Sequence, residues 1–383
     1  MQITHIELHN WRNFKKTGVD LPNRVFIAGA NASGKSNFLD AFRFLKDLAD
    51  IGLEKSISNR GGITKIKCLH ARSSPAIELK AVFSEGSTIW KYEISITQEP
   101  RGQRRPIISK EYVHKNDKVV LERPDEVDNK DPDQKTQTAL EQISRNADFR
   151  GLAKFLKEIS DLHIIPQVIR PPELFPWQGN GSDQFGWTLI KNISSAFPST
   201  QKKRLSIIEE ALSNIVPNLT NLNLTEPDSE GKRHLEVRFQ HWRPRGARQN
   251  ELEFSDGTLR LIGLFWALLE GKGLLLMEEP ELYLHPSIIR KIPQLIHRLQ
   301  KRADNRQVMI STHSPDLLLK SNGVAPEEIL LLKQGAEATD IKTMNSIDEL
   351  GPLLLSGMDY DEITTQYTEP ESIEQLDLFI NKV

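Results

Sequence analysis

The stretch "FIAGANASGKSNFLD", from Phe26 to Asp40, joins a short apolar strand to an amphipathic helix through a glycine-rich turn. Within it, Gly29 to Ser36 has the spacing of a phosphate-binding loop, in which two glycines are followed by a lysine and a hydroxyl residue. The glycines let the backbone curl so that its N–H groups point at phosphate oxygens. The helix that follows adds the positive end of its dipole. The alternative, a glycine-rich surface turn, fits less well between a strand and a helix, so the loop is predicted to bind ATP or GTP.

Nine residues of this loop and of the first helical turn are predicted to contact the nucleotide. They are Gly29, Ala30, Asn31, Ala32, Ser33, Gly34, Lys35, Ser36 and Asn37. Lys35 supplies the positive charge for the β- and γ-phosphates, and the hydroxyl of Ser36 is a predicted Mg2+ ligand.

Composition and charge are those of an ordinary folded protein with a polar surface. The chain has 383 residues, of which 38% are hydrophobic and 27% charged, and its formal net charge is −2. Such a chain has no overall attraction to nucleic acid, so DNA binding would need a local basic patch. The most apolar stretch, Leu261–Met277, is interrupted by Glu270–Gly273, which indicates a buried helix and strand rather than a membrane span. With one cysteine, Cys68, and no signal-peptide pattern, the chain is expected to be cytoplasmic with no membrane partner.

Two later strands end in residues suited to nucleotide chemistry. The run "GLLLMEEPELYLHP" (Gly273–Pro286) delivers Glu278 and Glu279 to the end of a buried strand, where ligands sit in open α/β sheets. The first carboxylate is a predicted Mg2+ ligand, through water, and the second is predicted to orient or deprotonate the attacking water. A strand ending in a charged surface turn is the alternative. The run "QVMISTHSPDLL" (Gln307–Leu318) places His313 after another strand, where a neutral imidazole could hydrogen-bond the γ-phosphate.

A further anion site is predicted in "LEFSDGTLRLIGLFWALL" (Leu252–Leu269), where Ser255, Asp256 and Gly257 start a long apolar helix. The start of such a helix offers backbone N–H groups, a hydroxyl and a helix dipole. We expect these three residues to complete the γ-phosphate site of a second subunit. The alternative is that Ser255 is only a helix N-cap.

In chain order, these four segments are the phosphate loop, the Ser-Asp-Gly helix, the glutamate strand and the histidine strand. In that order they resemble the motifs of the ABC-type ATPases, in the branch that contains the SMC, RecF and OLD families. "GANASGKS" resembles their Walker A, "FSDGT" their signature, "LLLMEEP" their Walker B with Glu279 as the catalytic residue, and "STHSP" their His switch. The opening "IELHNWRNF" is similar to the first strand of that branch. The usual Walker B acid is Asp, and Glu278 is one methylene longer. Gln167, after a short strand in "HIIPQV", is the candidate for the metal-binding Q-loop.

The resemblance implies an α/β fold, an ABC-ATPase-type core with a mostly parallel sheet flanked by helices, plus an antiparallel β subdomain and a helical insertion. The expected domain is a single ATPase head over 1–383, divided as follows: core lobe 1–60 and 250–335, antiparallel β subdomain 61–121, helical and β insertion 136–249, and C-terminal extension 336–383. Glu122 to Lys135 is rich in Asp, Asn, Lys and Pro, which indicates a solvated loop. A helix is expected over Thr138–Leu162 and a short strand at "HIIPQV".

The resemblance also implies a function, which is ATP hydrolysis with ATP and Mg2+ as cofactors. The expected protein is a switch subunit that forms a homodimer around ATP and controls a separate effector chain, a nuclease, in prokaryotic anti-phage defence. The residues after His313 are too few for a Toprim nuclease domain and lack its upstream strand ending in Glu. The alternatives are a RecF-like DNA-binding repair ATPase and a self-contained nuclease.

Three smaller motifs bear on these alternatives. Asp359-Tyr360-Asp361 has a spacing that metals could use, although a solvated acidic turn is the simpler interpretation. The run "RFQHWRPRGARQ" carries Arg238, Arg243, Arg245 and Arg248 beside His241 and Trp242, and "RGQRR" (Arg101–Arg105) is a second basic loop. Either could contact a phosphate backbone, which keeps DNA as a candidate partner, or could be a hairpin turn with solvated arginines.

Overall fold

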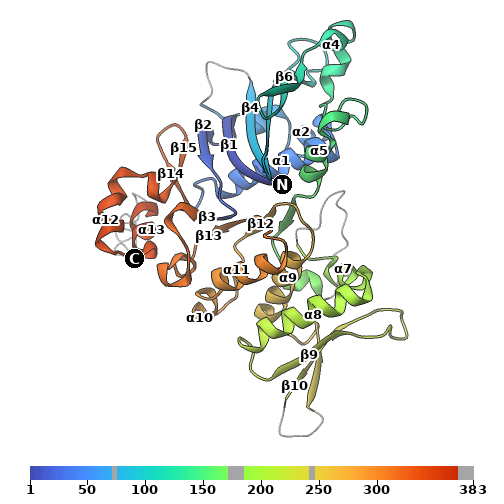
Figure 1. Ribbon diagram of the computed structural model, residues 1–383, viewed down its shortest axis with the longest axis vertical. Helices are drawn as coiled ribbons and strands as arrows, with labels where there is room; N and C mark the ends of the chain where they lie inside the picture. The colour runs from blue at the N-terminus through green and yellow to red at the C-terminus, as the bar shows by residue number, and fades with distance from the viewer. Residues whose placement is uncertain (71–75, 171–184, 241–245, 370–383) are drawn as a thin grey trace, which may run out of the picture. The chain divides into compact units, whose positions relative to one another are not determined.

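A computed structural model describes residues 1–70, 76–170, 185–240 and 246–369 (Figure 1). The chain forms two compact units: unit 1 is Met1–Ile159 with Gln307–Val383, and unit 2 is Ser160–Arg306. Across the described part of the chain, no helix combines the length and apolarity needed to cross a membrane.

Unit 1 contains two groups of strands and the helix that follows the phosphate loop. Its strands are β1 (Gln2–Trp11), β2 (Phe14–Asp20), β3 (Arg24–Gly29), β4 (Ile77–Glu85), β5 (Thr88–Gln98), β6 (Pro106–Lys115), β7 (Lys118–Arg123), β13 (Val308–Thr312), β14 (Ile329–Gln334) and β15 (Thr339–Thr343). Its α-helices are α1 (Lys35–Asp50), α2 (Leu53–Ser58), α3 (Ile63–Ile66), α4 (Glu126–Lys130), α5 (Arg150–Lys157), α12 (Gly351–Ser356) and α13 (Tyr360–Thr368).

The first group is an antiparallel sheet in the order β2-β1-β4-β5-β6-β7. Side chains alternate along its strands, so that Ile77, Leu79 and Ala81 of β4 are buried while the residues between them are half-buried. Strands β4, β5, β6 and β7 thus pair antiparallel, each with the next strand along the chain.

The second group is centred on β3, which is buried along its whole length. β3 pairs in parallel with β13 on one side and with β14 on the other, and β15 adds an antiparallel edge. Helix α1 contacts β3 and β13, and its Phe38 and Phe44 rings contact Phe14 and Trp11 of the antiparallel sheet. Because strands pack on two sides of α1, apolar side chains occupy most of the surface around the helix axis.

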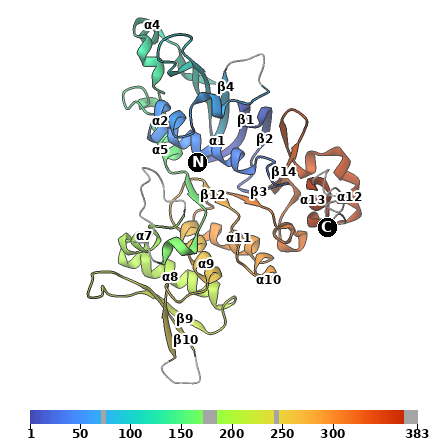
Figure 2. The ribbon, with the colours of Figure 1, turned by 180° about the vertical axis from the view of Figure 1, so that it is seen from behind.

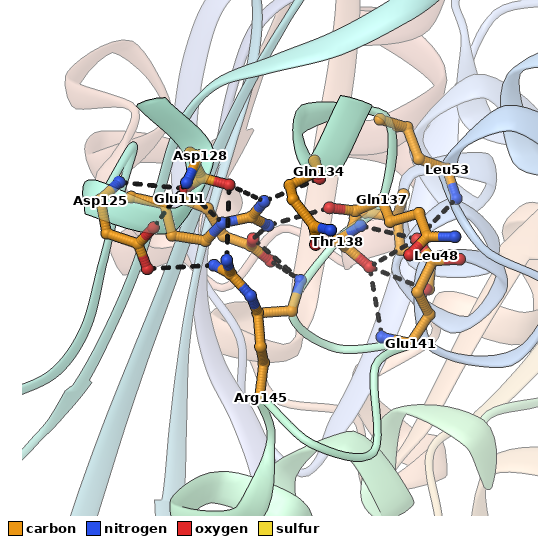
Figure 3. A network of polar contacts seen from close by, with 12 residues as sticks. Leu48, Leu53, Glu111, Asp125, Asp128, Gln134, Gln137, Thr138, Glu141 and Arg145 are labelled. Atoms are coloured by element: carbon orange, nitrogen blue, oxygen red, sulfur yellow. Dashed lines mark hydrogen bonds and ion pairs between the residues drawn. The ribbon is translucent and has the colours of Figure 1, made fainter. Parts of the chain in front are cut away.

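The solvated segment predicted for Glu122–Lys135 is confirmed for most of its side chains, which are exposed, but the segment also holds the end of β7, the helix α4 and two buried charges. Arg123 and Asp128 are 1% and 0% exposed, and together with Glu111 they form a buried ionic network (Figure 3). Arg123 donates two hydrogen bonds to Asp128, at 3.0 and 2.6 Å, and one to Glu111, at 2.8 Å. A composition average counts these residues as polar, but it cannot detect that their charges pair with one another.

The network also fixes the end of the phosphate-loop helix. Glu111 accepts hydrogen bonds from the Ala139 amide, and Thr138 Oγ1 donates to the carbonyl of Leu48 in the last turn of α1 (Figure 3). Glu141 accepts from the amide of Leu53, the first residue of α2. Because residues 138–141 make these contacts, the helix predicted over Thr138–Leu162 is wrong in its first half, and only α5 forms.

The described part of unit 2 contains six α-helices, a three-stranded sheet and two parallel strands. Its elements are β8 (Ser160–Leu162), α6 (Pro166–Ile169), α7 (Leu189–Ser195), α8 (Pro198–Ser213), β9 (Leu219–Leu224), β10 (Leu235–Phe239), β11 (Ala247–Asn250), α9 (Asp256–Leu269), β12 (Leu275–Glu278), α10 (Pro286–Ile289) and α11 (Ile292–Arg302). Figure 2 labels its helices α7 to α11 and its strands β9, β10 and β12. α9 packs against α8 and α11, α8 packs on β9, and β12 pairs in parallel with β8. The strand predicted at "HIIPQV" is wrong, because Pro166 starts the short helix α6, a position where its ring fits.

The last residue of unit 2 closes the end of α9. The guanidinium of Arg306, which is 3% exposed, donates to the carbonyls of Ala267 and Glu270 and, at 2.7 Å, to that of Gly273. A cation at this end also opposes the negative pole of the helix dipole.

Candidate nucleotide site

The predicted phosphate loop lies at the C-terminal end of β3, between its two parallel neighbours. Lys35 is only 6% exposed, and its ammonium group lies inside the loop, where Nζ donates to the carbonyls of Gly29 and Ala30 at 2.7 and 3.0 Å. The same nitrogen is 3.3 Å from Nδ1 of His313, which follows β13. The structure therefore brings together two residues that the sequence predicted separately.

This contact assigns the tautomer of His313. An ammonium group has only donors, so a hydrogen bond at this contact requires Nδ1 to accept, which corresponds to the imidazole tautomer with its proton on Nε2. A neutral imidazole of this kind can donate a hydrogen bond from Nε2 to a phosphate oxygen.

Gly34 is required where the loop turns into α1. Its φ is +105°, and a Cβ atom there would lie 2.0 Å from Nδ2 of Asn13. Asn13 approaches so closely because it braces the loop: its Nδ2 donates to the carbonyl of Ser33 at 3.0 Å and to Oγ1 of Thr339 at 2.6 Å, and its Oδ1 accepts from Nδ2 of Asn37 at 2.9 Å.

Thr339 completes this brace, since its own Oγ1 donates to the carbonyl of Ser33 at 2.8 Å. Sequence reasoning missed both bracing residues. The signal for Asn13 was the similarity of "IELHNWRNF" to a family strand, which gave no role to that side chain, and nothing in the sequence pointed to Thr339.

The first turn of α1 is suited to an anion. Its N-cap, Gly34, has no side chain to accept the terminal amides, and no acidic residue lies in the first turn. Oγ of Ser33, in the loop itself, is buried with no hydrogen-bond partner among the described residues. These features fit a triphosphate, and Ser36 in the same turn is where a hydroxyl ligand for Mg2+ is expected. Of the other predicted residues, Asn31 is exposed in the loop.

A cavity of about 470 Å³ opens beside the loop. Ala32 and Asn37 line it together with Arg12 and Asn13 from the β1–β2 turn, and further lining comes from residues 65–70 and 334–339. Cavities of this size hold small-molecule ligands, so there is room for a nucleoside next to the phosphate loop.

The predicted catalytic carboxylates lie in unit 2, at the end of β12. Glu279 has a φ of +45°, which is uncommon for a residue with a side chain. Nη1 of Arg260, from α9, donates to the Glu279 carbonyl at 3.1 Å. The Glu278 carbonyl is 3.3 Å from Nδ1 of His163.

Arg260 is the third residue that sequence reasoning missed, after Asn13 and Thr339. It is 3% exposed, its guanidinium carbon lies 5.2 Å from the centre of the Tyr283 ring, and burial lowers the pKa of its guanidinium. Arg260 belongs to the signature helix α9, and its guanidinium donates to the carbonyl of Glu279. This side chain therefore connects two of the predicted motifs. The sequence shows that an arginine follows Ser-Asp-Gly, but it does not show which way the side chain of that arginine points.

The Ser-Asp-Gly segment starts α9 as predicted. Oγ of Ser255 accepts from the Thr258 amide at 3.1 Å, which is an N-cap contact. A Cβ atom on Gly257 would lie 3.2 Å from the carbonyl of Tyr283, so this glycine allows the turn after β12 to approach α9. The N-cap contact of Ser255 does not test whether this segment also completes the γ-phosphate site of a second subunit, which stays a prediction.

Gln167, the predicted Q-loop residue, lies beside this segment. Its Nε2 donates to Oδ2 of Asp256 at 2.9 Å, and Arg170 pairs with Oδ1 of the same carboxylate at 2.5 Å. The predicted site residues thus fall into two groups, one with Lys35 in unit 1 and one with Asp256 and Glu279 in unit 2.

The smaller motifs have structural contacts. Asp359 caps α13 and accepts from the amides of Tyr360 and Lys320. Within the described residues, no group of three or more His, Cys, Asp and Glu side chains could hold a metal ion. In the loop Arg101–Arg105, Arg105 pairs with Glu99 and Asp133.

In the other basic run, Arg238 lies opposite Arg248 in the β10–β11 hairpin. Arg243, Arg245, His241 and Trp242 are outside the described residues.

Comparison with known proteins agrees with the predicted fold. The chain is 24% identical over 351 residues to "Endonuclease GajA" of Bacillus cereus (strain VD045), which covers 83% of this chain and 56% of that protein. It is 22% identical over 414 residues to "Retron Ec83 probable ATPase" of Escherichia coli, which covers 88% of this chain and 72% of that protein. The chain thus spans a little over half the length of the first of these relatives.

Among solved structures, the SMC head bound to the C-winged helix domain of ScpA matches with a TM-score of 0.51 at 15% identity, over 89% of this chain and 97% of that one. This likeness confirms the predicted α/β fold of an SMC-type ABC-ATPase head. Residues 24–319, which include the phosphate loop, the Ser-Asp-Gly helix, the glutamate strand and His313, match one family along their whole length. The chain therefore belongs to the family described as "AAA domain, putative AbiEii toxin, Type IV TA system".

Proposed function

We propose that the chain is an ATPase subunit that binds ATP at Gly29–Ser36 and hydrolyses it to ADP and phosphate. The observation that supports this most is the position of Lys35, whose ammonium group lies inside the loop 2.7 Å from the carbonyl of Gly29 and 3.3 Å from His313. On binding, this ammonium would exchange backbone carbonyls for the β- and γ-phosphate oxygens. The cavity lined by Ala32 and Asn37 would take the nucleoside.

The remaining residues have the following proposed functions. Mg2+, held by the Ser36 hydroxyl and through water by Glu278, would neutralise charge on the phosphates. Glu279 would accept the proton of the attacking water, and Gln167 is the candidate for a further metal contact. His313 would donate its Nε2 proton to the γ-phosphate in a hydrogen bond, so that loss of this phosphate changes the contacts of His313.

Two chains are proposed to form a homodimer around two ATP molecules. Ser255, Asp256 and Gly257 of one chain would then face the γ-phosphate held by Lys35 of the other. A helix start that meets a phosphate only in the dimer makes assembly depend on ATP.

The output of this switch is proposed to be control of a separate effector chain, a nuclease, in prokaryotic anti-phage defence. Support comes from the toxin in the family description and from the names of the relatives, one an endonuclease and the other a retron ATPase.

Lys35→Ala tests the nucleotide site. It should lower the affinity for a fluorescent ATP analogue at least about 100-fold while leaving the thermal unfolding temperature within a few degrees, because the loss is of a phosphate contact. Lys15→Ala, which removes an exposed lysine paired with Glu337 in the same unit, is the matched control and should bind normally. Equal affinity of Lys35→Ala and wild type would refute the proposed site.

A mixed dimer of Ser255→Arg and Lys35→Ala chains tests the trans arrangement. If the site is shared between chains, one of the two sites in the mixture is intact, and activity should return to about half that of wild type if the sites are independent. If each site is built within one chain, every site carries a lesion and no activity returns.

A further inference from the structure

The two helix starts at the proposed ATP site differ in charge. α1 begins at Gly34 with no acidic residue in its first turn, whereas α9 begins at Ser255 and carries Asp256 as its first residue. A carboxylate there suits the dipole of its own helix, but it repels a phosphate approaching the same end. A helix start that is to face the γ-phosphate therefore needs this negative charge to be cancelled.

Arg170 provides the cancelling charge. Its Nη2 lies 2.5 Å from Oδ1 of Asp256 and donates to the carbonyl of Phe254 at 2.7 Å. Gln167 occupies the second carboxylate oxygen, Oδ2, at 2.9 Å. The side chains of Arg170 and Asp256 are 23% and 30% exposed, so solvent screens the pair only in part.

The two side chains that contact Asp256 come from one short segment of the chain. Gln167 lies in the single turn of α6, and Arg170 is the C-cap of that turn, so both side chains leave one short segment and reach the start of α9. Since the Phe254 carbonyl lies just before Ser255, the guanidinium holds the backbone as well as the carboxylate. The segment around α6 thus sets both the charge and the orientation of the Ser-Asp-Gly segment.

We propose that Arg170 is a positioning residue for the ATPase reaction, which cancels the charge of Asp256 so that Ser255 and Gly257 can face the γ-phosphate of ATP bound to a second chain. This inference rests on the proposed function. It differs from a purely mechanical link between α6 and α9, because it requires the positive charge of Arg170 only while Asp256 is negative.

Four variants distinguish an effect of charge from a purely mechanical link between α6 and α9. Arg170→Gln leaves Asp256 uncompensated and should lower kcat/KM for ATP about 10- to 100-fold, with unchanged binding of a fluorescent ATP analogue to the monomer. Asp256→Asn supplies the second background for the comparison, in which the amide can still accept from Gln167 and no carboxylate charge is left to cancel. The double variant Arg170→Gln/Asp256→Asn should return to within about threefold of Asp256→Asn. Arg170→Lys, which keeps the charge, should retain most of the activity.

Arg302→Gln is the matched control, because it removes an exposed arginine that pairs with Glu210 in the same unit. It should leave kcat/KM unchanged. Thermal melting of every variant shows whether it folds, and Arg170→Lys keeps the test usable if Arg170→Gln does not.

The outcomes are distinguishable. A wild-type rate in folded Arg170→Gln overturns the inference and leaves the proposed ATPase function intact. A double variant as inactive as Arg170→Gln, or an inactive Arg170→Lys, overturns it in favour of a mechanical link. A wild-type protein that neither binds nor hydrolyses ATP removes the proposed function, and this inference with it.

Discussion

Replacing Asn13 with Ala should weaken ATP binding although Asn13 lies outside the phosphate loop. The change removes three side-chain hydrogen bonds of 2.6, 2.9 and 3.0 Å, to Thr339, Asn37 and Ser33. A hydrogen bond of this kind contributes about 1 kcal/mol net, so the brace is worth about 3 kcal/mol. Part of that energy holds unit 1 together, and part holds the loop in the geometry that accepts phosphate.

If about half of the energy restricts the loop, ATP affinity should fall about 10-fold, which corresponds to about 1.4 kcal/mol. The free energy of unfolding should fall by about 1 to 3 kcal/mol. The first quantity is measured by titration with a fluorescent ATP analogue and the second by urea unfolding.

Asn116→Ala is the matched control for this prediction. Asn116 is likewise an asparagine in a turn between two strands, and its Oδ1 accepts one exposed hydrogen bond, from the Ile89 amide in the same unit. It should cost less than about 1 kcal/mol of stability and leave ATP affinity unchanged. If Asn13→Ala loses stability but binds ATP as tightly as wild type, the brace does not shape the loop, and the reasoning fails.

Three further predictions concern the carboxylates and the buried cations. Glu279→Gln should bind ATP normally and hydrolyse it at least about 100-fold more slowly, with dimer accumulating on size exclusion in ATP and Mg2+; turnover at the wild-type rate would mean that another group is the base. Arg260→Met should lower kcat about 10-fold with KM within about twofold, because the methionine fills the space but no longer holds the Glu279 carbonyl; an equal kcat would contradict this. Burial disfavours the charged form of Asp128, but hydrogen bonds from Arg123 and from the Asp125 amide outweigh this and lower its pKa from 3.8 to about 2. A lowered folded pKa stabilises the fold above pH 4 and loses this effect as the pH falls from about 4 to about 2. Asp128→Asn should therefore unfold in urea about 2 kcal/mol more easily than wild type at pH 7, a gap that closes between pH 4 and pH 2, whereas a gap independent of pH would refute the assignment.

The phosphate loop could be predicted from the sequence because its requirements are local. A left-handed backbone at Gly34, a lysine next to it and a helix start all fall within a few residues. The brace could not be predicted, since Asn13 and Thr339 are 326 positions apart and no pattern in either segment refers to the other. Arg260 was missed for a different reason. An arginine in a helix is expected to be exposed to solvent unless the residues that pack around it are known.

The wrong expectations share a physical origin. The segment Glu122–Lys135 has the composition of a loop and is mostly exposed, but Arg123 and Asp128 within it are buried because Arg123 pairs with Asp128 and Glu111. The "HIIPQV" run has the apolar content of a strand, but Pro166 removes a donor from any sheet ladder and favours a helix start. Local composition could not decide between these outcomes because contacts distant in sequence decide them.

The position of β3 between β13 and β14 has a consequence for biosynthesis. Arg24 on β3 pairs with Val308 on β13, so the strand that carries the phosphate loop leaves the ribosome some 284 residues before its partner. At synthesis rates of about 5–20 residues per second, β3 waits roughly 15 to 60 s without that neighbour. Unit 2, Ser160–Arg306, is continuous in sequence and is synthesised in the second half of that interval. A nascent chain that stops before β13 therefore carries the complete loop sequence with an open apolar strand beside it, and such a chain is exposed to aggregation and to chaperones until the last strands arrive.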